Sequence, residues 1–409
     1  MEPVTHYLGG AGRDQWTDPR ESPKPPSPPS PRPLAVSPDD LVNLVSLCRS
    51  GRIYAVEVWI KDGKPIQVEP PPRGPRKSTP LQVAIDAKFH DLVLLLLSNG
   101  YRPDLEPEPP LDRVLRLRAW DLLELLLTWG ADPTRVDPET VLDTYQSDLM
   151  ERFWSFGVDY TRDHVLAHYL TSSTRNRPAY GWARRHRDDP RIGRDLAMAL
   201  GEAIWDDNEK AVSLLLWAGA DPHRRVPTLR WSSPEEEDDE ELLGTAVEAA
   251  VHAGKGHLIR FLKPDPQRDD FGALWSAVHD PESVDRLAAI NPPTDWSPSI
   301  INCINRLSYR FLAGSDWPTK HCLERISDQH GGSLSTLAGK DCVDLRRSMF
   351  RIRDSYDFRW LLDWLRKPRH CDPAIYADLT RTSAMQARLT AAGLVRKPIV
   401  AKAKPRRRS

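Results

Sequence analysis

One segment recurs along this chain and limits the folds that the chain can adopt. Residues 125–133 read Leu-Leu-Leu-Thr-Trp-Gly-Ala-Asp-Pro, and residues 214–222 read Leu-Leu-Leu-Trp-Ala-Gly-Ala-Asp-Pro. Each copy combines a leucine-rich helix end, a glycine able to adopt the left-handed conformation, and an Asp-Pro turn. Weaker copies occupy residues 95–104 and 152–159. The chain is therefore predicted to be a helical repeat solenoid rather than two or three separate globular domains.

The spacing of the glycines that end these segments supports a repeat of about 30 residues. Successive gaps are 37, 30, 27 and 62 residues, and the last gap equals two periods of 31. A helix-start signal, Thr-Pro-Leu-Gln-Val-Ala, stands at residues 79–84, and a similar Gly-Thr-Ala-Val-Glu-Ala-Ala stands at residues 244–250. Gly51 and Gly254 fall where a turn between two helices is expected. The predicted stop glycines are Gly63, Gly100, Gly130, Gly157 and Gly219.

The start signal and the Leu-Leu-Leu-x-x-Gly-Ala-Asp ending together resemble the ankyrin-repeat family, from about residue 39 to 222 and less closely to about 296. The resemblance implies an all-α solenoid of about eight to ten helix-turn-helix units joined by hairpin loops. Some units depart from the pattern. Residues 109–111 keep only Pro-Pro-Leu of the start signal, the unit before Gly157 has a short first helix, and residues 164–190 keep only the length of a repeat.

Composition divides the chain into four parts. Residues 1–36 are proline-rich and are predicted to be a disordered tail, and residues 396–409 form a basic disordered tail. Residues 37–296 form the predicted solenoid, which an acidic loop interrupts at 224–241. Residues 297–395 are interpreted as divergent repeats or a helical cap. Helices are expected there near 300–312, 320–326, 345–365 and 374–392.

Charge and cysteine content restrict the environment of the protein. A formal net charge of −1 gives no global attraction to nucleic acid or to an anionic membrane. The apolar runs are too short to span a bilayer. The cysteines are odd in number and lack a Cys-x-x-Cys spacing, which argues against a disulfide framework and for a reducing compartment. We therefore expect a soluble cytoplasmic protein. The five cysteines are Cys48, Cys303, Cys322, Cys342 and Cys371.

The sequence contains no motif that identifies an enzyme. Residues 254–257, Gly-Lys-Gly-His, follow a predicted helix rather than a strand and are interpreted as an inter-helix turn, not a phosphate loop. His164 and His168 stand one helical turn apart without a nearby third ligand, so packing or surface roles are favoured over a metal site. The histidines and cysteines between residues 321 and 371 match no zinc module. We expect no catalysis, no cofactor and no metal.

The ankyrin resemblance implies that the ends of the first helices contribute to a concave surface that binds another protein. Arginine and tryptophan are common among the residues that dominate binding interfaces. Packing of Trp205 beneath an irregular neighbour is an equally weighted alternative for that residue. Counting back from the inter-helix turns predicts a partner-binding set of Arg49, Asp86, Arg116, Leu117, Trp205, Asp206 and His252.

Our main functional hypothesis is a non-enzymatic scaffold, acting as a monomer or within a hetero-complex. One alternative is a neutralising binder of the toxin-immunity or anti-defence type, which occludes the active site of its partner. Another is nucleic-acid binding through the basic tail and the arginines between residues 175 and 194, which lie near Tyr180 and Trp182. A solvated arginine face over packed aromatic residues is the favoured interpretation of that segment. The sequence does not identify the partner.

Overall fold

The computed structural model describes residues 33–68, 78–172, 174–227, 243–308, 317–337, 339–352 and 355–393. These residues are predominantly α-helical, and the chain divides into two compact units, residues 1–195 (unit 1) and 196–409 (unit 2). The prediction of an all-α protein is confirmed. Most of the proline-rich tail, the acidic run at 235–241 and the basic tail at 396–409 lie outside the described residues.

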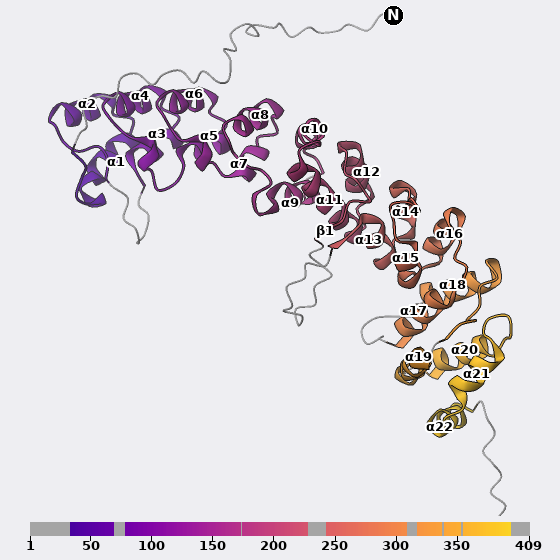
Figure 1. Ribbon diagram of the computed structural model, residues 1–409. Coiled ribbons are helices and arrows are strands. Elements are labelled where there is room, and N and C mark those ends of the chain that lie inside the picture. The colour runs from indigo at the N-terminus through magenta and orange to yellow at the C-terminus, as the bar shows by residue number, and fades with distance from the viewer. Residues whose placement is uncertain are drawn as a thin grey trace, which may run out of the picture. The chain divides into compact units, whose positions relative to one another are not determined.

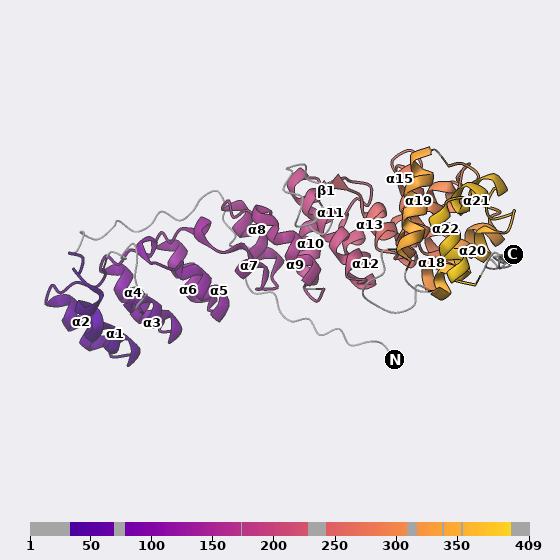
Figure 2. The same ribbon diagram turned by 90° about the horizontal axis from the view of Figure 1, so that it is seen from below.

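Unit 1 consists of successive helix pairs (Figures 1 and 2). The first helix of each pair packs against the first helix of the next pair, and α2, α4 and α6 pack against one another in order, as α8 does against α10. The first helices are α1 (Val42–Arg49), α3 (Pro80–Asp86), α5 (Pro110–Leu117), α7 (Pro138–Leu142) and α9 (Val165–Ser172). The second helices are α2 (Ile53–Lys61), α4 (His90–Ser98), α6 (Trp120–Thr128), α8 (Ser147–Ser155) and α10 (Arg177–Arg185).

Unit 2 continues with the same kind of pairing. Its first helices pack consecutively from α13 to α21, and its second helices pack consecutively from α12 to α18. The first helices are α13 (Ala246–His252), α15 (Phe271–Ala277), α17 (Ser297–Ser308), α19 (Gly339–Arg351) and α21 (Pro373–Thr380), after α11 (Pro190–Trp205), which begins in unit 1. The second helices are α12 (Glu209–Ala218), α14 (Gly256–Leu262), α16 (Pro281–Ile290), α18 (Trp317–Glu324), α20 (Ser355–Leu365) and α22 (Ser383–Ala391).

Short elements occupy the connections between these pairs. Strands β1 (Val226–Pro227) and β2 (Leu243–Gly244) pair antiparallel, with Val226 opposite Gly244. One turn of π-helix, Arg325–Gln329, extends α18. Turns of 3-10 helix occur at Pro38–Leu41, Pro103–Leu105, Pro133–Arg135 and Arg162–His164.

Local sequence explains where α3 begins and why α4 packs beside it. Thr79 Oγ1 accepts a hydrogen bond from the Gln82 backbone N–H at 3.1 Å, and Gln82 Oε1 accepts one from the Thr79 N–H at 3.3 Å. This capping box satisfies two N–H groups that the helix itself leaves unpaired. On α4, Leu92 and Leu96 are fully buried, and burial of one such side chain contributes about 1.5 to 3 kcal/mol. The caps set the helix boundary, and the leucines join neighbouring pairs.

The predicted stop glycines all lie in the left-handed region. Gly63, Gly100, Gly130, Gly157 and Gly219 have φ values of 74°, 92°, 82°, 96° and 100°. Because glycine has no Cβ, it adopts this conformation without the steric penalty that other residues incur. The glycine pattern in the sequence therefore reports the actual ends of the second helices.

The pattern missed three features of the fold. Residues 164–190 contain a complete pair, α9 and α10, but α10 ends at His186 with φ −103° rather than at a left-handed glycine. Lys263, with φ 50°, ends α14 in the place of a glycine. The helix expected over residues 345–365 is two helices, α19 and α20, separated near Ile352.

Candidate functional site: the turn edge of unit 1

The turns that connect first to second helices form one side of unit 1, which we name the turn edge. It comprises residues 49–52, 86–90, 116–119, 143–146 and 174–177. Contacts join the first three turns in order, and another joins the fifth turn to the end of α7. The Phe89 ring packs so closely on Gly51 that a Cβ added to Gly51 would lie 2.8 Å from it. Lys88 Nζ donates to the Leu117 carbonyl at 2.9 Å, and Asn176 Nδ2 donates to the Leu142 carbonyl at 2.7 Å.

Three of these turns place a large side chain at a left-handed position. Lys88, Arg118 and Tyr145 have φ values of 53°, 53° and 60°, whereas the first turn uses Gly51 at 65°. For a residue with a Cβ, this conformation has a steric cost of about 1 to 2 kcal/mol. Backbone strain of this kind concentrates at functional positions. The turn edge thus holds basic and aromatic side chains at positions where glycine would be less strained.

The four predicted site residues of unit 1 lie at the ends of consecutive first helices, as their spacing indicated. Arg49 and Arg116 are exposed, and Leu117 is half-buried. Asp86 is also exposed, but Arg113 holds its carboxylate in two hydrogen bonds, of which the Nη2–Oδ2 bond measures 2.6 Å. The Asp86 oxygens are therefore already engaged within unit 1.

The three predicted residues of unit 2 lie at the ends of α11 and α13. Trp205 is half-buried, and its indole Nε1 is buried without a hydrogen-bond acceptor among the described residues. Asp206 and His252 are exposed. Partial burial of the His252 imidazole, in a residue that is exposed as a whole, and the nearby Arg306 guanidinium both lower the pKa of His252. Arg306 Nη2 donates to the His252 carbonyl at 3.3 Å.

The turn edge also carries exposed side chains that are not among the predicted site residues. Arg52, Lys88 and Arg118 are exposed, and Tyr145 exposes 43% of its surface. Counting back from the turn selected only the last residues of each first helix. Extending the same count through the turn finds Arg52, Lys88 and Arg118, whereas Tyr145 lies in a turn for which no site residue was predicted.

The arginine-rich segment around α10 does not present aromatic rings to solvent. Tyr180 and Trp182 are both fully buried. The Trp182 ring lies 4.9 Å from the Tyr160 ring and 5.4 Å from the Trp154 ring, in edge-to-face contacts. Arg184 remains exposed outside this cluster. The favoured interpretation of a solvated arginine face over packed aromatic residues is therefore confirmed.

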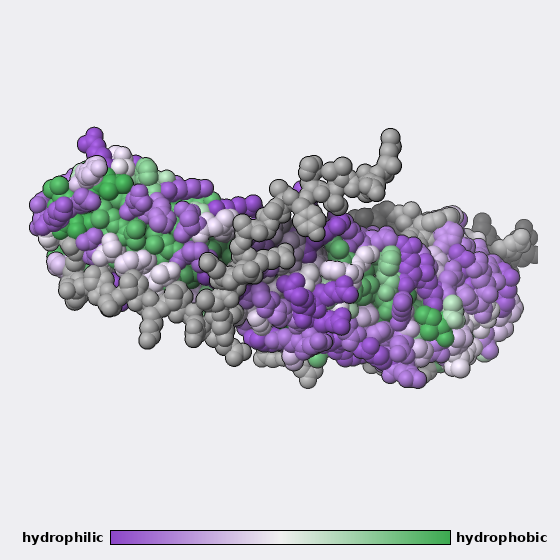
Figure 3. Space-filling view, turned by 90° about the horizontal axis from the view of Figure 1, so that it is seen from above, coloured by the Kyte–Doolittle hydropathy of each residue, from purple (hydrophilic) through white to green (hydrophobic). Residues whose placement is uncertain are grey.

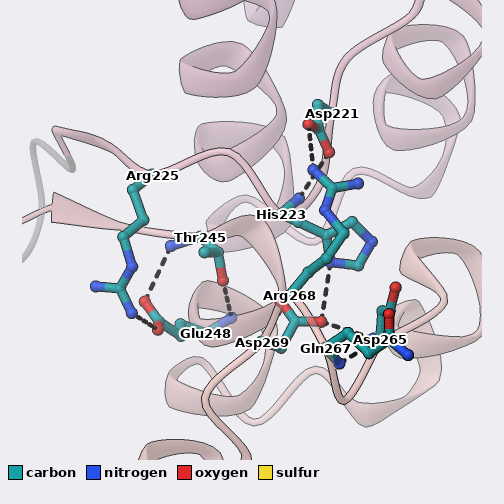
Figure 4. A network of polar contacts seen from close by, with 9 residues as sticks. All are labelled: Asp221, His223, Arg225, Thr245, Glu248, Asp265, Gln267, Arg268 and Asp269. Carbon is teal, nitrogen blue, oxygen red and sulfur yellow. Dashed lines mark hydrogen bonds and ion pairs between the residues drawn. The ribbon is translucent and has the colours of Figure 1, made fainter.

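A polar network in unit 2 joins loops that are far apart in sequence (Figure 4). His223 Nδ1 lies 2.9 Å from Asp269 Oδ2, and Arg268 Nη2 donates to Asp221 Oδ2 at 2.6 Å. Burial acts to raise the pKa of Asp221, but hydrogen bonds from Arg268 and from the His223 backbone outweigh it, so the pKa is lowered. Nearby, Arg225 Nη2 donates to Glu248 Oε1 at 2.8 Å. The network ties the segment before β1 to α13 and to the loop at 265–269.

The structure also bears on metal binding and on membrane spanning. His164 Nδ1 lies 3.0 Å from Asp195 Oδ1, so this histidine has a carboxylate partner within unit 1. Histidine, cysteine and acidic side chains form no cluster of three or more suited to a metal ion within the described ranges. Among the same residues, no helix has the length and apolar content needed to cross a membrane.

An apolar area covers part of the second helices of unit 1. Figure 3 shows hydrophobic residues gathered over the end that carries α2 and α4. Tyr54, Val58 and Leu94 expose 84%, 57% and 37% of their surfaces there.

Comparisons with known proteins do not assign the chain to a family. No protein-family model matches it, and no curated protein matches its sequence significantly.

Proposed function

We propose that the chain is an ankyrin-repeat protein that binds a partner protein through its turn edge and acts without catalysis. One observation carries the proposal: the first three turns of unit 1 are joined by the packing of Phe89 on Gly51 and by the Lys88–Leu117 hydrogen bond, and the second and third turns present Lys88 and Arg118 in left-handed conformations. A rigid edge loses little conformational entropy on binding, which favours affinity. The paired helices, the capping box at Thr79 and the glycine stops support the ankyrin interpretation.

Nucleic-acid binding is the weaker candidate. Single-stranded nucleic acids are commonly held by aromatic side chains on which their bases stack. The two aromatic residues of the arginine-rich segment, Tyr180 and Trp182, are buried and unable to serve in this way. The remaining attraction would come from the arginines of this segment and from the basic tail, and the net charge of −1 provides no additional field.

The proposal is tested by affinity capture from the cells that encode the protein. The edge variant carries Arg49→Ala, Arg116→Ala and Arg118→Ala, because these side chains are exposed and removing them leaves the core intact. A matched control removes three exposed basic side chains elsewhere in unit 1, with Lys61→Ala, Arg162→Ala and Arg187→Ala. Circular dichroism verifies that both variants fold.

We expect the intact protein and the control variant to recover the same partner in stoichiometric amount, and the edge variant to lose it. Equal recovery by all three proteins would show that the turn edge of unit 1 does not bind the partner. Recovery of nuclease-sensitive material alone would contradict protein binding and favour the nucleic-acid alternative. The partner's identity would decide between a scaffold and a neutralising binder.

A further inference from the structure

Resting on the function proposed above, we infer that the turn edge of unit 1 recognises an acidic segment of its partner protein. The inference concerns the first three turns, which are adjacent in space. Phe89 links the first turn to the second, and Lys88 links the second turn to the third. Charge on these three turns therefore acts over one continuous surface.

Basic side chains predominate on these turns. Arg49, Arg52 and Arg118 are exposed and form no ion pair with any residue that the structure describes. Arg116 is also exposed and helps to hold down the pKa of Asp112, against the stronger effect of burial. Guanidinium groups left without a carboxylate partner are suited to bidentate binding of one.

The acidic residues of the same turns do not cancel this charge. Asp86 is held by Arg113, which comes from the body of α5, so that pair is neutral. Asp91 and Asp121 are exposed in the first turns of α4 and α6. Lys88 adds a further positive charge beside them. The three turns therefore keep a net positive charge. Their basic side chains are interspersed with Asp91 and Asp121 and do not form a continuous basic surface.

This distribution favours a protein segment over a nucleic acid. A phosphate backbone carries a charge at every nucleotide and would bring some phosphates against Asp91 and Asp121. Acidic side chains on a polypeptide are spaced by the sequence and can contact Arg52 and Arg118 while avoiding the two aspartates. Phe89 exposes 40% of its surface on the same edge and offers an apolar contact to a protein.

The test uses the purified full-length chain and a fluorescein-labelled poly-glutamate peptide. The edge-reversal variant carries Arg49→Glu, Arg52→Glu and Arg118→Glu. The control reverses Lys61, Arg162 and Arg187 to glutamate, which changes the net charge equally on exposed residues outside the turn edge. Fluorescence anisotropy is measured at low salt, about 0.05 M, where the Debye length exceeds the roughly 10 Å found at 0.1 M. Circular dichroism verifies the fold of each protein.

We expect the edge reversal to weaken peptide binding about tenfold or more and the control to weaken it less than about threefold, because only the former removes direct partners. Equal effects of the two variants would overturn the inference, since binding would then follow net charge alone. Absence of binding by the intact chain at low salt would overturn it as well. Tighter binding of a single-stranded oligonucleotide of matched charge, lost on edge reversal, would assign the edge to nucleic acid instead.

Failure of this inference can be distinguished from failure of protein binding itself. If the captured cellular partner binds the edge-reversal variant as well as the intact chain, but is lost after Asp206→Ala and His252→Ala, protein binding stands and the acidic assignment fails. If no protein is captured under any condition, the proposed function fails whatever the peptide titration shows.

Discussion

Glu106 gives unit 1 a pH dependence whose sign and size follow from its surroundings. The side chain is 2% exposed, accepts a hydrogen bond from Thr79 Oγ1 at 2.9 Å, and is also bonded by the Tyr101 hydroxyl. Burial raises the pKa of Glu106 from 4.5 to about 6, although both hydrogen bonds act to lower it. The folded protein therefore binds the Glu106 proton more tightly than the unfolded chain does.

The raised pKa of Glu106 makes the folded state less stable as pH rises. A raised carboxyl pKa contributes stability that is fully present below the unfolded value of 4.5 and is lost as pH rises through about 6. Taking about 1.4 kcal/mol for each pH unit between the two values gives a total of about 2 kcal/mol. About 1 kcal/mol of this stability is lost between pH 5 and pH 8.

Glu106→Gln removes the titrating group and nearly preserves its shape. We expect the unfolding free energy of the variant, relative to the intact chain, to rise by about 1 kcal/mol between pH 5 and pH 8. Urea unfolding followed by circular dichroism measures this difference at each pH. Hydrogen exchange of peptides covering residues 78–117 identifies the transition that includes Glu106.

The matched control is Glu139→Gln, which removes an exposed carboxylate of unit 1 that is not among the groups acting on the pKa of Glu106. A Glu106→Gln effect of equal size at pH 5 and pH 8 would refute the reasoning, as would a relative loss of stability at pH 8. Either result would mean that ionised Glu106 is not penalised by its burial.

Other substitutions test packing, capping and burial. Gly256→Ala should destabilise unit 2 by about 3 kcal/mol or more in urea unfolding, because the added Cβ would lie 2.4 Å from the backbone of α16. Gly201→Ala, where an added Cβ would meet no atom within 4 Å, should be neutral or should stabilise unit 2 by up to about 1 kcal/mol. Equal effects of the two substitutions would contradict the close packing at Gly256. Thr245→Ala should lower the free energy of unfolding by about 1 kcal/mol, because it removes the capping box of α13. An unchanged urea midpoint would show that this capping box does not stabilise the helix. Burial raises the pKa of the Cys48 and Cys371 thiols to about 12, so both thiols should resist alkylation by iodoacetamide at pH 8 until urea unfolds the chain. Rapid alkylation of the folded protein, detected by mass spectrometry, would disprove their burial.

Features that depend on local backbone conformation could be predicted from the sequence. Gly100 and Gly130 end their helices in the left-handed conformation, and the Thr79 capping box begins α3 as its motif indicates. Each of these features involves residues within one helical turn of each other. A single sequence therefore carries the complete signal.

Features that depend on distant partners could not be predicted in this way. Asp86 was selected as a partner-binding residue, but Arg113, 27 residues later, engages its carboxylate. Lys88 and Lys263 occupy left-handed positions without the glycine that would have signalled them. Without that glycine, only the three-dimensional structure reveals that the backbone turns there.

Site-directed photo-crosslinking along α2 distinguishes binding through the turn edge from binding elsewhere on unit 1. A photoreactive phenylalanine analogue is placed at Arg52, on the turn edge, or at Lys61, at the opposite end of the same helix; both positions are exposed. Irradiation in cells that encode the protein should crosslink a single partner protein from position 52 and none from position 61. Crosslinking to the same protein from position 61 alone, or equally from both positions, would contradict binding through the turn edge.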